Sequence, residues 1–286
     1  MSEDSVHEFK YAEADFIRVK ATIHRKAGIH LGDSKKQLVY SRLARRLRIL
    51  KLTTFNEYLN YLDSNTQELQ EFINALTTNL TAFFREEHHF TILANFVAKH
   101  RNNRPCRIWC AASSTGEEPY SIAMTLVQAY GSYKPPVKIV ASDIDSNVLR
   151  TAATGIYDLE RLDALSQAQK KQFFLRGKGR NSGKAKVIDE LRKLIDFRQI
   201  NLLDKSWQLE GKFDVIFCRN VMIYFDKPTQ LTLLARMTAL LESDGLYIAG
   251  HSESFSHASH LVHIVDKTTY RLAHRSTLEN NDELRK

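Results

Sequence analysis

The second part of the chain carries one repeated pattern that leaves few folds open to it. Short, continuous apolar runs end in polar residues and alternate with segments of helical spacing. The apolar runs are residues 107–112, 137–143, 213–220 and 245–251. The helical segments between them are residues 118–131, 146–155 and 228–245. Continuous apolar runs are typical of parallel strands buried on both faces, so the alternation predicts an α/β fold with a doubly wound, mostly parallel sheet. Such a sheet binds its ligand at the carboxyl ends of its strands.

Two segments depart from this alternation. Residues 161–200 contain a charged, glycine-bearing stretch, and we expect them to form a small inserted antiparallel β-subdomain with an exposed loop. Residues 260–273 are expected to form a closing hairpin that turns at Asp266 and Lys267.

The first part of the chain shows helical spacing only. Its apolar residues fall into successive groups, which are Phe16, Val19, Ile23 and Ala27; Val39, Leu43, Leu47 and Leu50; Phe55, Tyr58, Leu59 and Leu62; and Leu69, Phe72, Ile73, Leu76 and Leu80. We therefore expect an all-helical N-terminal domain at 1–78, a linker and connecting helix at 79–104, and the sheet domain at 105–286.

Positive charge is concentrated in one of these helical segments. The formal net charge is +8, and seven basic residues with no acidic one fall between Lys35 and Lys51. The apolar stripe of this segment leaves for the outer face the arginines Arg42, Arg45, Arg46 and Arg48. Such a face is either simply solvated or a site for an acidic partner, for which nucleic acid, anionic lipid and an acidic protein surface all qualify.

Apolar content and the placement of the cysteines indicate the cellular compartment. No apolar run approaches the length that spans a bilayer, and the first residues are acidic and polar, so we expect a soluble, cytoplasmic protein. The three cysteines, Cys106, Cys110 and Cys218, lie in or beside apolar runs, as buried reduced thiols do. This placement favours neither a disulfide framework nor a metal cluster.

The loop after the first apolar run is unusual for a nucleotide-binding fold. Phosphate cradles present bare backbone N–H groups at a helix start, yet this loop offers one glycine, Gly116, followed by Glu117 and Glu118. We expect the helix to begin at Pro119, with both carboxylates facing the ligand. The alternative is that the two glutamates only complement the helix dipole. Glu118 is expected to contact the ligand, whereas the role of Glu117 stays open between complementing the dipole and supporting the site from behind.

A second pair of carboxylates follows the next run, at Asp143 and Asp145. An acid at the tip of the second strand is where α/β nucleotide folds bind ribose hydroxyls. The expected ligand therefore has a ribose and no phosphate. S-adenosylmethionine meets both conditions, whereas the pyrophosphate of a dinucleotide would meet Glu117 and Glu118.

Several long motifs resemble one known family. In chain order they are NALTTNLTAFFREEHHF, AASSTGEEPYSIAM, ASDID, FDVIFCRNVMIYFDK and GLYIAGHSESF. Together they resemble the chemotaxis receptor methyltransferases of the CheR family. The resemblance implies methyl transfer from S-adenosylmethionine to glutamate side chains on the cytoplasmic helices of chemoreceptors, giving γ-glutamyl methyl esters and S-adenosylhomocysteine. It also implies a cytoplasmic protein recruited to receptor arrays at the inner face of the membrane, without metal, nucleic acid or membrane insertion.

The resemblance also assigns roles to individual residues. The implied cofactor contacts are Asn79, Thr81, Arg85, Glu118, Asp143, Asn201, Leu202, Arg219 and Asn220. The residues implied near the transferred methyl group are Arg85 and Tyr224. In some members of the family the inserted β-subdomain docks on a peptide at the receptor C-terminus, and the glycines of RGKGRNSGK are similar to that docking type.

The methyl transfer implied by the resemblance does not require a strong general base among the side chains. A glutamate nucleophile is already ionised near neutral pH, so positioning and electrostatics replace a strong general base. Arg85 is expected to orient the substrate carboxylate, and its alternative is a buried ion pair with Glu86, Glu87 or another acid. Tyr224 is expected to direct its hydroxyl at the reacting centre, and its alternative is a core aromatic.

Other readings of the sequence stay open or are disfavoured. The basic arginines are expected to meet receptor helices rich in Glu and Gln; a nucleic-acid methyltransferase and a non-catalytic module that senses S-adenosylmethionine are the alternatives. His88 and His89 diverge on a helix and do not suggest a metal site. Residues 250–254, GHSES, only partly match the nucleophile elbow of hydrolases.

Overall fold

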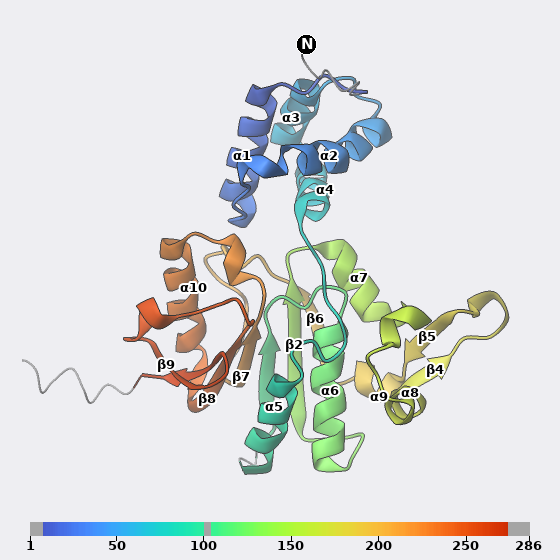
Figure 1. Cartoon of the computed structure of the whole chain (residues 1–286), viewed down its shortest axis with the longest axis vertical. Coiled ribbons are helices and arrows are strands. Elements are labelled where there is room, and N and C mark those ends of the chain that lie inside the picture. The colour runs from blue at the N-terminus through green and yellow to red at the C-terminus, as the bar shows by residue number, and fades with distance from the viewer. Residues whose placement is uncertain (1–7, 100–103, 274–286) are drawn as a thin grey trace, which may run out of the picture.

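A computed structural model of the chain describes residues 8–99 and 104–273, so the outermost residues of the expected domains lie outside the described part. An all-helical domain lies at the top of Figure 1 and an α/β domain below it. The helical domain contains α1 (Glu13–Ala27), α2 (Lys36–Leu50), α3 (Phe55–Ser64) and α4 (Thr66–Leu76). The expected apolar groups pack together in one core, except Leu80. Leu80 is 78% exposed because α4 ends at Leu76 and the chain continues in extended conformation.

The main sheet has seven strands in the order β6-β2-β1-β7-β8-β10-β9. Their bounds are β1 (Cys106–Cys110), β2 (Val137–Asp143), β6 (Ile195–Gln199), β7 (Phe213–Cys218), β8 (Leu241–Ala249), β9 (Val262–Asp266) and β10 (Thr269–Leu272). The strands from β6 to β8 run parallel, and β10 pairs antiparallel with both β8 and β9. The predicted fold class and the closing hairpin are therefore confirmed.

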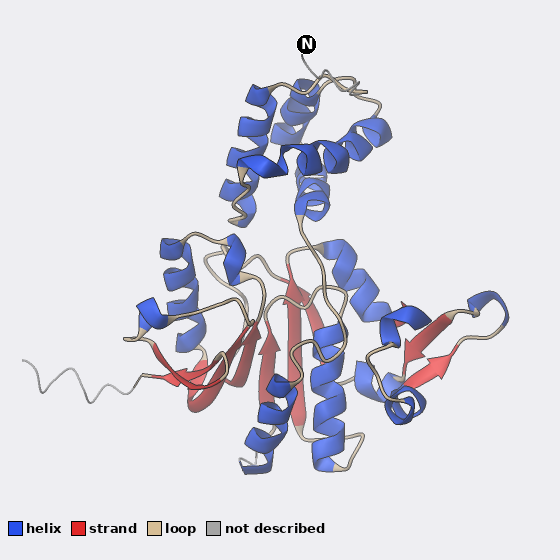
Figure 2. Cartoon of the chain, viewed as in Figure 1, coloured by secondary structure: helices blue, strands red, loops and turns tan. Residues whose placement is uncertain are grey.

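Helices cover both faces of this sheet (Figure 2). The helices are α5 (His88–Lys99), α6 (Glu117–Tyr130), α7 (Ser146–Thr154) and α10 (Lys227–Ala239). α5 and α6 pack on the face that presents Ile108 and Phe217, whereas α10 packs on the face that presents Trp109 and Ile216. The last predicted helical segment was too long, because α10 ends at Ala239 and β8 already begins at Leu241.

A separate three-stranded antiparallel sheet projects from the α/β domain and forms the inserted subdomain. Its order is β3-β5-β4, with β3 (Ile156–Asp158), β4 (Phe174–Arg176) and β5 (Lys184–Val187), and it carries the short helices α8 (Gln167–Phe173) and α9 (Asp189–Arg192). The expected bounds of 161–200 shift at both ends, because β3 precedes residue 161 and β6 pairs with β2 in the main sheet. β6 was not recognised because it is an edge strand with exposed charges at Asp196 and Arg198.

Single turns of 3₁₀ helix complete the chain at η1 (Asp33–Lys35), η2 (Leu159–Leu162), η3 (Gly179–Asn181), η4 (Met222–Tyr224) and η5 (Ser256–Ala258). All three cysteines are buried free thiols, as their sequence context predicted. Within residues 8–99 and 104–273, no helix has the length and apolar character needed to cross a membrane.

Candidate active site

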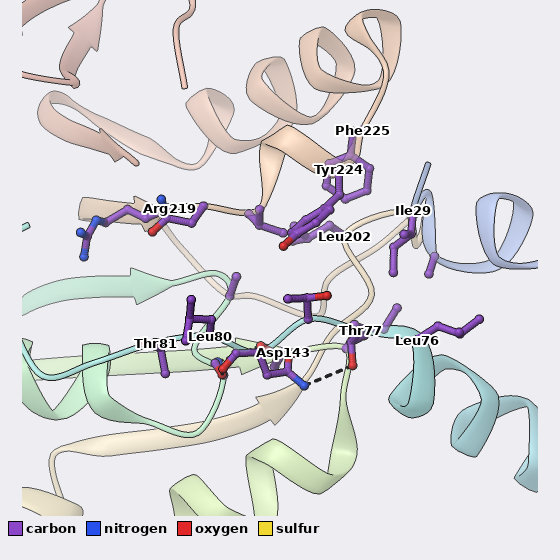
Figure 3. A pocket seen from close by; sticks show the side chains of 18 of the residues that line it. Ile29, Leu76, Thr77, Leu80, Thr81, Asp143, Leu202, Arg219, Tyr224 and Phe225 are labelled. Carbon is purple, nitrogen blue, oxygen red and sulfur yellow. Dashed lines mark hydrogen bonds between the residues drawn. The ribbon is translucent and has the colours of Figure 1, made fainter. Parts of the chain in front are cut away.

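A cavity of about 280 Å³ lies where the carboxyl ends of β1, β2 and β7 meet the helical domain. Every residue that the sequence analysis assigned to cofactor binding or catalysis lines it: Asn79, Thr81, Arg85, Glu118, Asp143, Asn201, Leu202, Arg219, Asn220 and Tyr224. These residues come from the interdomain linker, two strand-to-helix loops, the segment after β6 and the loop after β7. The fold therefore brings together at one place side chains that are more than a hundred positions apart (Figure 3).

The two glutamates that follow the β1–α6 loop differ in where their side chains lie. α6 begins at Glu117 rather than at Pro119. Glu117 is fully buried, forms an ion pair with Arg161 of the inserted subdomain and accepts a hydrogen bond of 2.6 Å from the Thr115 hydroxyl. Its carboxylate thus stabilises the junction with the subdomain and does not line the cavity. The expectation that both glutamates face the ligand was wrong for Glu117.

Gly116 also has a packing role. Its φ is +100°, and a Cβ at this position would lie 2.8 Å from both Ala152 Cβ and the Tyr157 hydroxyl oxygen. Glycine is therefore required here by the close approach of α7 and β3 and by the left-handed backbone. Gly116 is not among the residues that line the cavity.

Glu118 lines the cavity, but its charge is compensated from within the protein. It forms an ion pair with Arg219 and accepts a hydrogen bond of 3.2 Å from the Cys110 thiol. The Arg219 side chain is 1% exposed and also contacts Glu86 at 3.1 Å, while its Nη2 donates to the carbonyl oxygen of Arg85 at 2.6 Å. Arg219 thus links the β1–α6 loop to the interdomain linker, and Figure 3 shows its guanidinium pointing away from Tyr224.

Asp143 presents a buried carboxylate at the end of β2. One oxygen accepts the backbone N–H of Ser114 at 2.8 Å, and the other accepts the backbone N–H of Asp145 at 2.9 Å. Burial raises the pKa of Asp143 to about 6, against these two hydrogen bonds, which lower it. Each carboxylate oxygen has a second acceptor site, so both can still receive a hydroxyl from the cavity.

Asp145 has a structural task instead. Its side chain caps α7 by accepting the backbone N–H of Asn147 at 2.8 Å, and it accepts hydrogen bonds from the linker residues Thr77 and Asn79 at 2.7 and 2.8 Å. The amide nitrogen of Asn79 is therefore engaged with Asp145. Asp145 holds the start of the linker against the second strand-to-helix loop.

Arg85 has the freedom that a substrate-orienting residue needs. Its Nη1 donates to the carbonyl oxygen of Leu80 at 3.0 Å, and the side chain lines the cavity. Among the residues that the structure describes, Arg85 forms no ion pair, and Glu86 is paired with Arg219 instead. The alternative of a buried ion pair with Glu86 is thus not what the structure contains.

Tyr224 ends the turn η4 after β7. Its side chain is partly exposed, and its hydroxyl points into the cavity in Figure 3. The neighbouring Phe225 takes the core position and packs against Gly28, where a Cβ would lie 2.6 Å from the ring. The alternative of a core aromatic therefore applies to Phe225 and not to Tyr224.

The helical domain supplies one wall of the cavity that the sequence did not predict. The backbone N–H of His30 donates to the carbonyl oxygen of Tyr224 at 3.0 Å, and the Asn201 amide donates to the carbonyl oxygen of Lys26 at 2.7 Å. The lining residues from this domain are Ala27, Ile29, His30, Leu31, Gly32, Lys35, Leu38, Leu76, Thr77 and Thr78. The turn after α1 looked like a simple helix break, and no local signal pairs it with residues almost two hundred positions later.

The basic face of α2 is smaller than expected. Arg42 donates to the carbonyl oxygen of Thr77 at 2.6 Å, and Arg46 pairs with the buried Glu68 of α4 at 2.6 Å. Arg48 is exposed but pairs with Glu8 at 2.6 Å, so of these four arginines Arg45 alone is exposed without an ion pair to another described residue. The prediction of an outer face was wrong for Arg42 and Arg46, because α2 packs on α4 along that flank.

The adjacent histidines do not form a metal site. His89 is fully buried, and its Nε2 lies 2.9 Å from the Thr268 hydroxyl in the closing hairpin. Burial, followed by the nearby Arg219 charge, lowers the pKa of His89 to about 4, so the ring is neutral near pH 7. Within the described part of the chain, no group of three or more metal-binding side chains comes together.

Comparisons with known proteins agree with the geometry. Residues 14–77 match the family model described as "CheR methyltransferase, all-alpha domain", and residues 79–271 match "CheR methyltransferase, SAM binding domain". The chain is 61% identical over 264 residues to chemotaxis protein methyltransferase 2 of Pseudomonas aeruginosa, covering 92% of this chain and 94% of the relative. It is 50% identical over 264 residues to the chemotaxis protein methyltransferase of Escherichia coli, covering 92% of each chain.

Proposed function

The chain belongs to the CheR methyltransferase family and is an S-adenosylmethionine-dependent methyltransferase of chemotaxis, and on that premise we propose that it methylates glutamate side chains of chemoreceptors. The product is a γ-glutamyl methyl ester. The observation that carries the proposal is the cavity between the two domains, where the cofactor-binding residues of the α/β domain meet Arg85 and Tyr224. We further propose that the protein acts in the cytoplasm at receptor arrays and that a receptor C-terminal peptide docks on the inserted β-subdomain.

The residues of the cavity fit S-adenosylmethionine. The Asp143 carboxylate at the end of β2 keeps acceptor capacity beyond its backbone hydrogen bonds, which suits the ribose hydroxyls. Ile144, Ile200 and Leu202 provide an apolar wall near it that suits the adenine ring. Thr81, Glu118 and Asn220 lie on the cavity wall as polar partners for the amino acid end of the cofactor. Because Glu118 is paired with Arg219, the loop presents nearly neutral dipoles rather than the net negative charge expected from its sequence.

In the proposed reaction the protein has to position the substrate carboxylate and does not have to remove a proton from it. When bound, the cofactor supplies a methyl group on a sulfonium, which becomes a neutral thioether as the glutamate oxygen takes the methyl. The substrate carboxylate is ionised near neutral pH, so no proton has to leave it during attack. Arg85 would bind this carboxylate with guanidinium N–H groups that remain after its hydrogen bond to Leu80, and the Tyr224 hydroxyl would fix its angle.

In this proposal fewer arginines of α2 contact the receptor than the sequence suggested. Arg42 and Arg46 hold the helical domain together, which leaves the exposed Arg45 and Arg48 to meet acidic receptor helices. Reversing the charge in Arg45→Glu should weaken receptor methylation and its salt dependence while leaving the affinity for S-adenosylhomocysteine unchanged. Equal loss of both would instead indicate misfolding.

One assay tests the reaction. The protein is incubated with methyl-labelled cofactor and either receptor-containing membranes or RNA, and the product is treated with mild base. Label that mild base releases from the receptor as methanol supports the ester. Stable label on RNA, or no label on either substrate, contradicts the proposal. Arg85→Lys and Tyr224→Phe should each lower turnover on the receptor, and unchanged turnover would remove the residue from the catalytic set.

A further inference from the structure

Glu253 lies in the GHSES segment just after β8, and its carboxylate is buried, with 4% of the residue exposed. One carboxylate oxygen accepts the backbone N–H groups of Val221 and Met222 at 2.9 and 2.8 Å. The other accepts those of Asn220 and Gly250 at 3.0 and 2.6 Å. Within the part of the chain that the structure describes, Glu253 forms no ion pair. Its charge is therefore stabilised by backbone dipoles alone.

The segment that Glu253 binds is the loop that leads from β7 into the active site. Asn220, Val221 and Met222 are consecutive, and they join Arg219 to Tyr224 across η4. Three of the four N–H donors therefore belong to this loop, and the fourth, that of Gly250, belongs to the strand end beside it. Glu253 thus ties the loop of the β7 strand to the carboxyl end of β8.

The backbone of this loop is held in an unusual shape. Asn220 has a φ of +55°, a left-handed conformation that is uncommon for residues with a side chain and that Asn adopts more readily than most. Gly250 lies so close that a Cβ there would be 2.7 Å from the Asn220 backbone nitrogen. At the far end of η4, the Gln230 amide donates to the carbonyl oxygens of Met222 and Phe225 at 2.9 and 3.0 Å. The loop is therefore fixed in this shape by contacts at both of its ends.

We propose that Glu253 is a positioning residue for methyl transfer, because its carboxylate holds the loop 219–222 in the conformation that presents Asn220 and Tyr224 to the cofactor cavity. The GHSES segment thereby has a role that its partial likeness to a hydrolase elbow did not suggest. Burial raises the pKa of Glu253 although four backbone N–H groups favour its charged form, so the site has little besides these donors to keep the carboxylate ionised.

The variant Glu253→Gln replaces one acceptor oxygen by an amide that can only donate. Two of the four backbone N–H groups then lose their acceptor, and the loop is free to relax. A displacement of the order of 1 Å near reacting groups can cost up to about a hundredfold in rate. We expect the dissociation constant for S-adenosylhomocysteine to rise at least about fivefold and kcat on receptor membranes to fall at least about tenfold.

A control carboxylate is available on β7, the strand that leads into the loop held by Glu253. Asp214 lies at the other end of β7, is 7% exposed and accepts the backbone N–H of Arg107 at 2.7 Å. Unlike Glu253, it also pairs with the guanidinium of Arg104, at 2.7 Å, so the control removes a buried carboxylate together with an ion pair. Asp214→Asn also removes a buried carboxylate, but it does so far from the cavity. It should lower the thermal stability in the same way as Glu253→Gln while leaving the affinity for S-adenosylhomocysteine and kcat unchanged.

The experiment measures S-adenosylhomocysteine binding by calorimetry and kcat for the full chain, below the unfolding range of every variant. A cycle with Tyr224→Phe adds the decisive readout. If Glu253 acts through this loop, the two substitutions together should cost clearly less in kcat than the product of their separate effects. Multiplicative effects, or unchanged binding and kcat in Glu253→Gln, would overturn the proposal.

A fallback covers the case in which Glu253→Gln does not fold. Glu253→Asp keeps the charge and shortens the reach by one methylene, and it should show the same losses; normal binding and turnover in that variant would also overturn the inference. The kcat arm rests on the proposed receptor substrate. If even the unaltered protein fails to methylate receptors, the proposed function fails, whereas the binding measurements still decide the role of Glu253.

Discussion

Lowering the pH from 7 to 5 should weaken the binding of S-adenosylhomocysteine through one carboxylate, Asp143. Burial raises the pKa of this group to about 6 in the ligand-free protein. Two ribose hydroxyls that donate to its oxygens favour the ionised form, so the complex requires the proton to be absent. Binding is therefore strong above pH 6 and weakens as the pH falls through 6 and Asp143 takes up a proton.

The size of the effect follows from this pKa. A group that must lose a proton before binding reduces affinity by a factor of one plus ten to the power of the pKa minus the pH. For Asp143 the factor is about 1.1 at pH 7 and about 11 at pH 5, so the affinity should fall about tenfold, or about 1.4 kcal/mol. Each binding event should also release about half a proton at pH 6 and close to one proton at pH 5.

The protonation of Asp143 at low pH should weaken ligand binding without destabilising the folded protein. Its pKa is higher in the folded chain than the usual 3.8, so between about 3.8 and 6 the folded state binds more protons than the unfolded one. The contribution of Asp143 to stability therefore decreases as the pH rises through that window and is most favourable at the acidic end.

The assay is calorimetric titration with S-adenosylhomocysteine from pH 5 to 8, with Asp143→Asn as the control. The variant should bind weakly, with a shallow pH dependence that reports only the ligand and the other groups of the cavity. An affinity of the unaltered protein that does not change between pH 5 and 7, or an equal slope in Asp143→Asn, would refute the role assigned to this carboxylate.

Three further substitutions test the corrected assignments, each by denaturant-induced unfolding. Arg46→Met should lower the free energy of unfolding by about 3 kcal/mol, because it leaves the buried Glu68 without its cation; a neutral effect would return Arg46 to the receptor surface. Gly116→Ala should cost about 2 to 3 kcal/mol, from a left-handed backbone and a Cβ with contacts of 2.8 Å, and unchanged stability would contradict the packing role. Arg161→Ala should cost about 2 kcal/mol by leaving the fully buried Glu117 unpaired, and weaker cofactor binding without destabilisation would place that carboxylate at the site instead.

Local pattern in the sequence was sufficient for the fold class and for much of the site. Continuous apolar runs mark the buried parallel strands because a strand covered on both faces has no polar side. Two acids that follow these runs, Glu118 at the start of the next helix and Asp143 at a run's end, line the cavity because parallel strands place their carboxyl ends at one edge of the sheet. Motif resemblance added the remaining site residues, and all of them line the cavity: Asn79, Thr81, Arg85, Asn201, Leu202, Arg219, Asn220 and Tyr224.

What the sequence could not determine was which charges are compensated inside the protein. Glu117 and Glu118 are adjacent and chemically identical, yet one pairs with the inserted subdomain and the other lines the cavity. The sequence pattern places Arg42, Arg45 and Arg46 alike outside the apolar stripe of α2. In the structure α4 packs beside Arg42 and Arg46, so these two are engaged within the helical domain. These outcomes depend on contacts between residues far apart in the chain, and the pairing energy of a charge depends on what the fold places beside it. The same reason explains why the cavity wall from the helical domain and the four N–H groups around Glu253 appeared only in the tertiary structure.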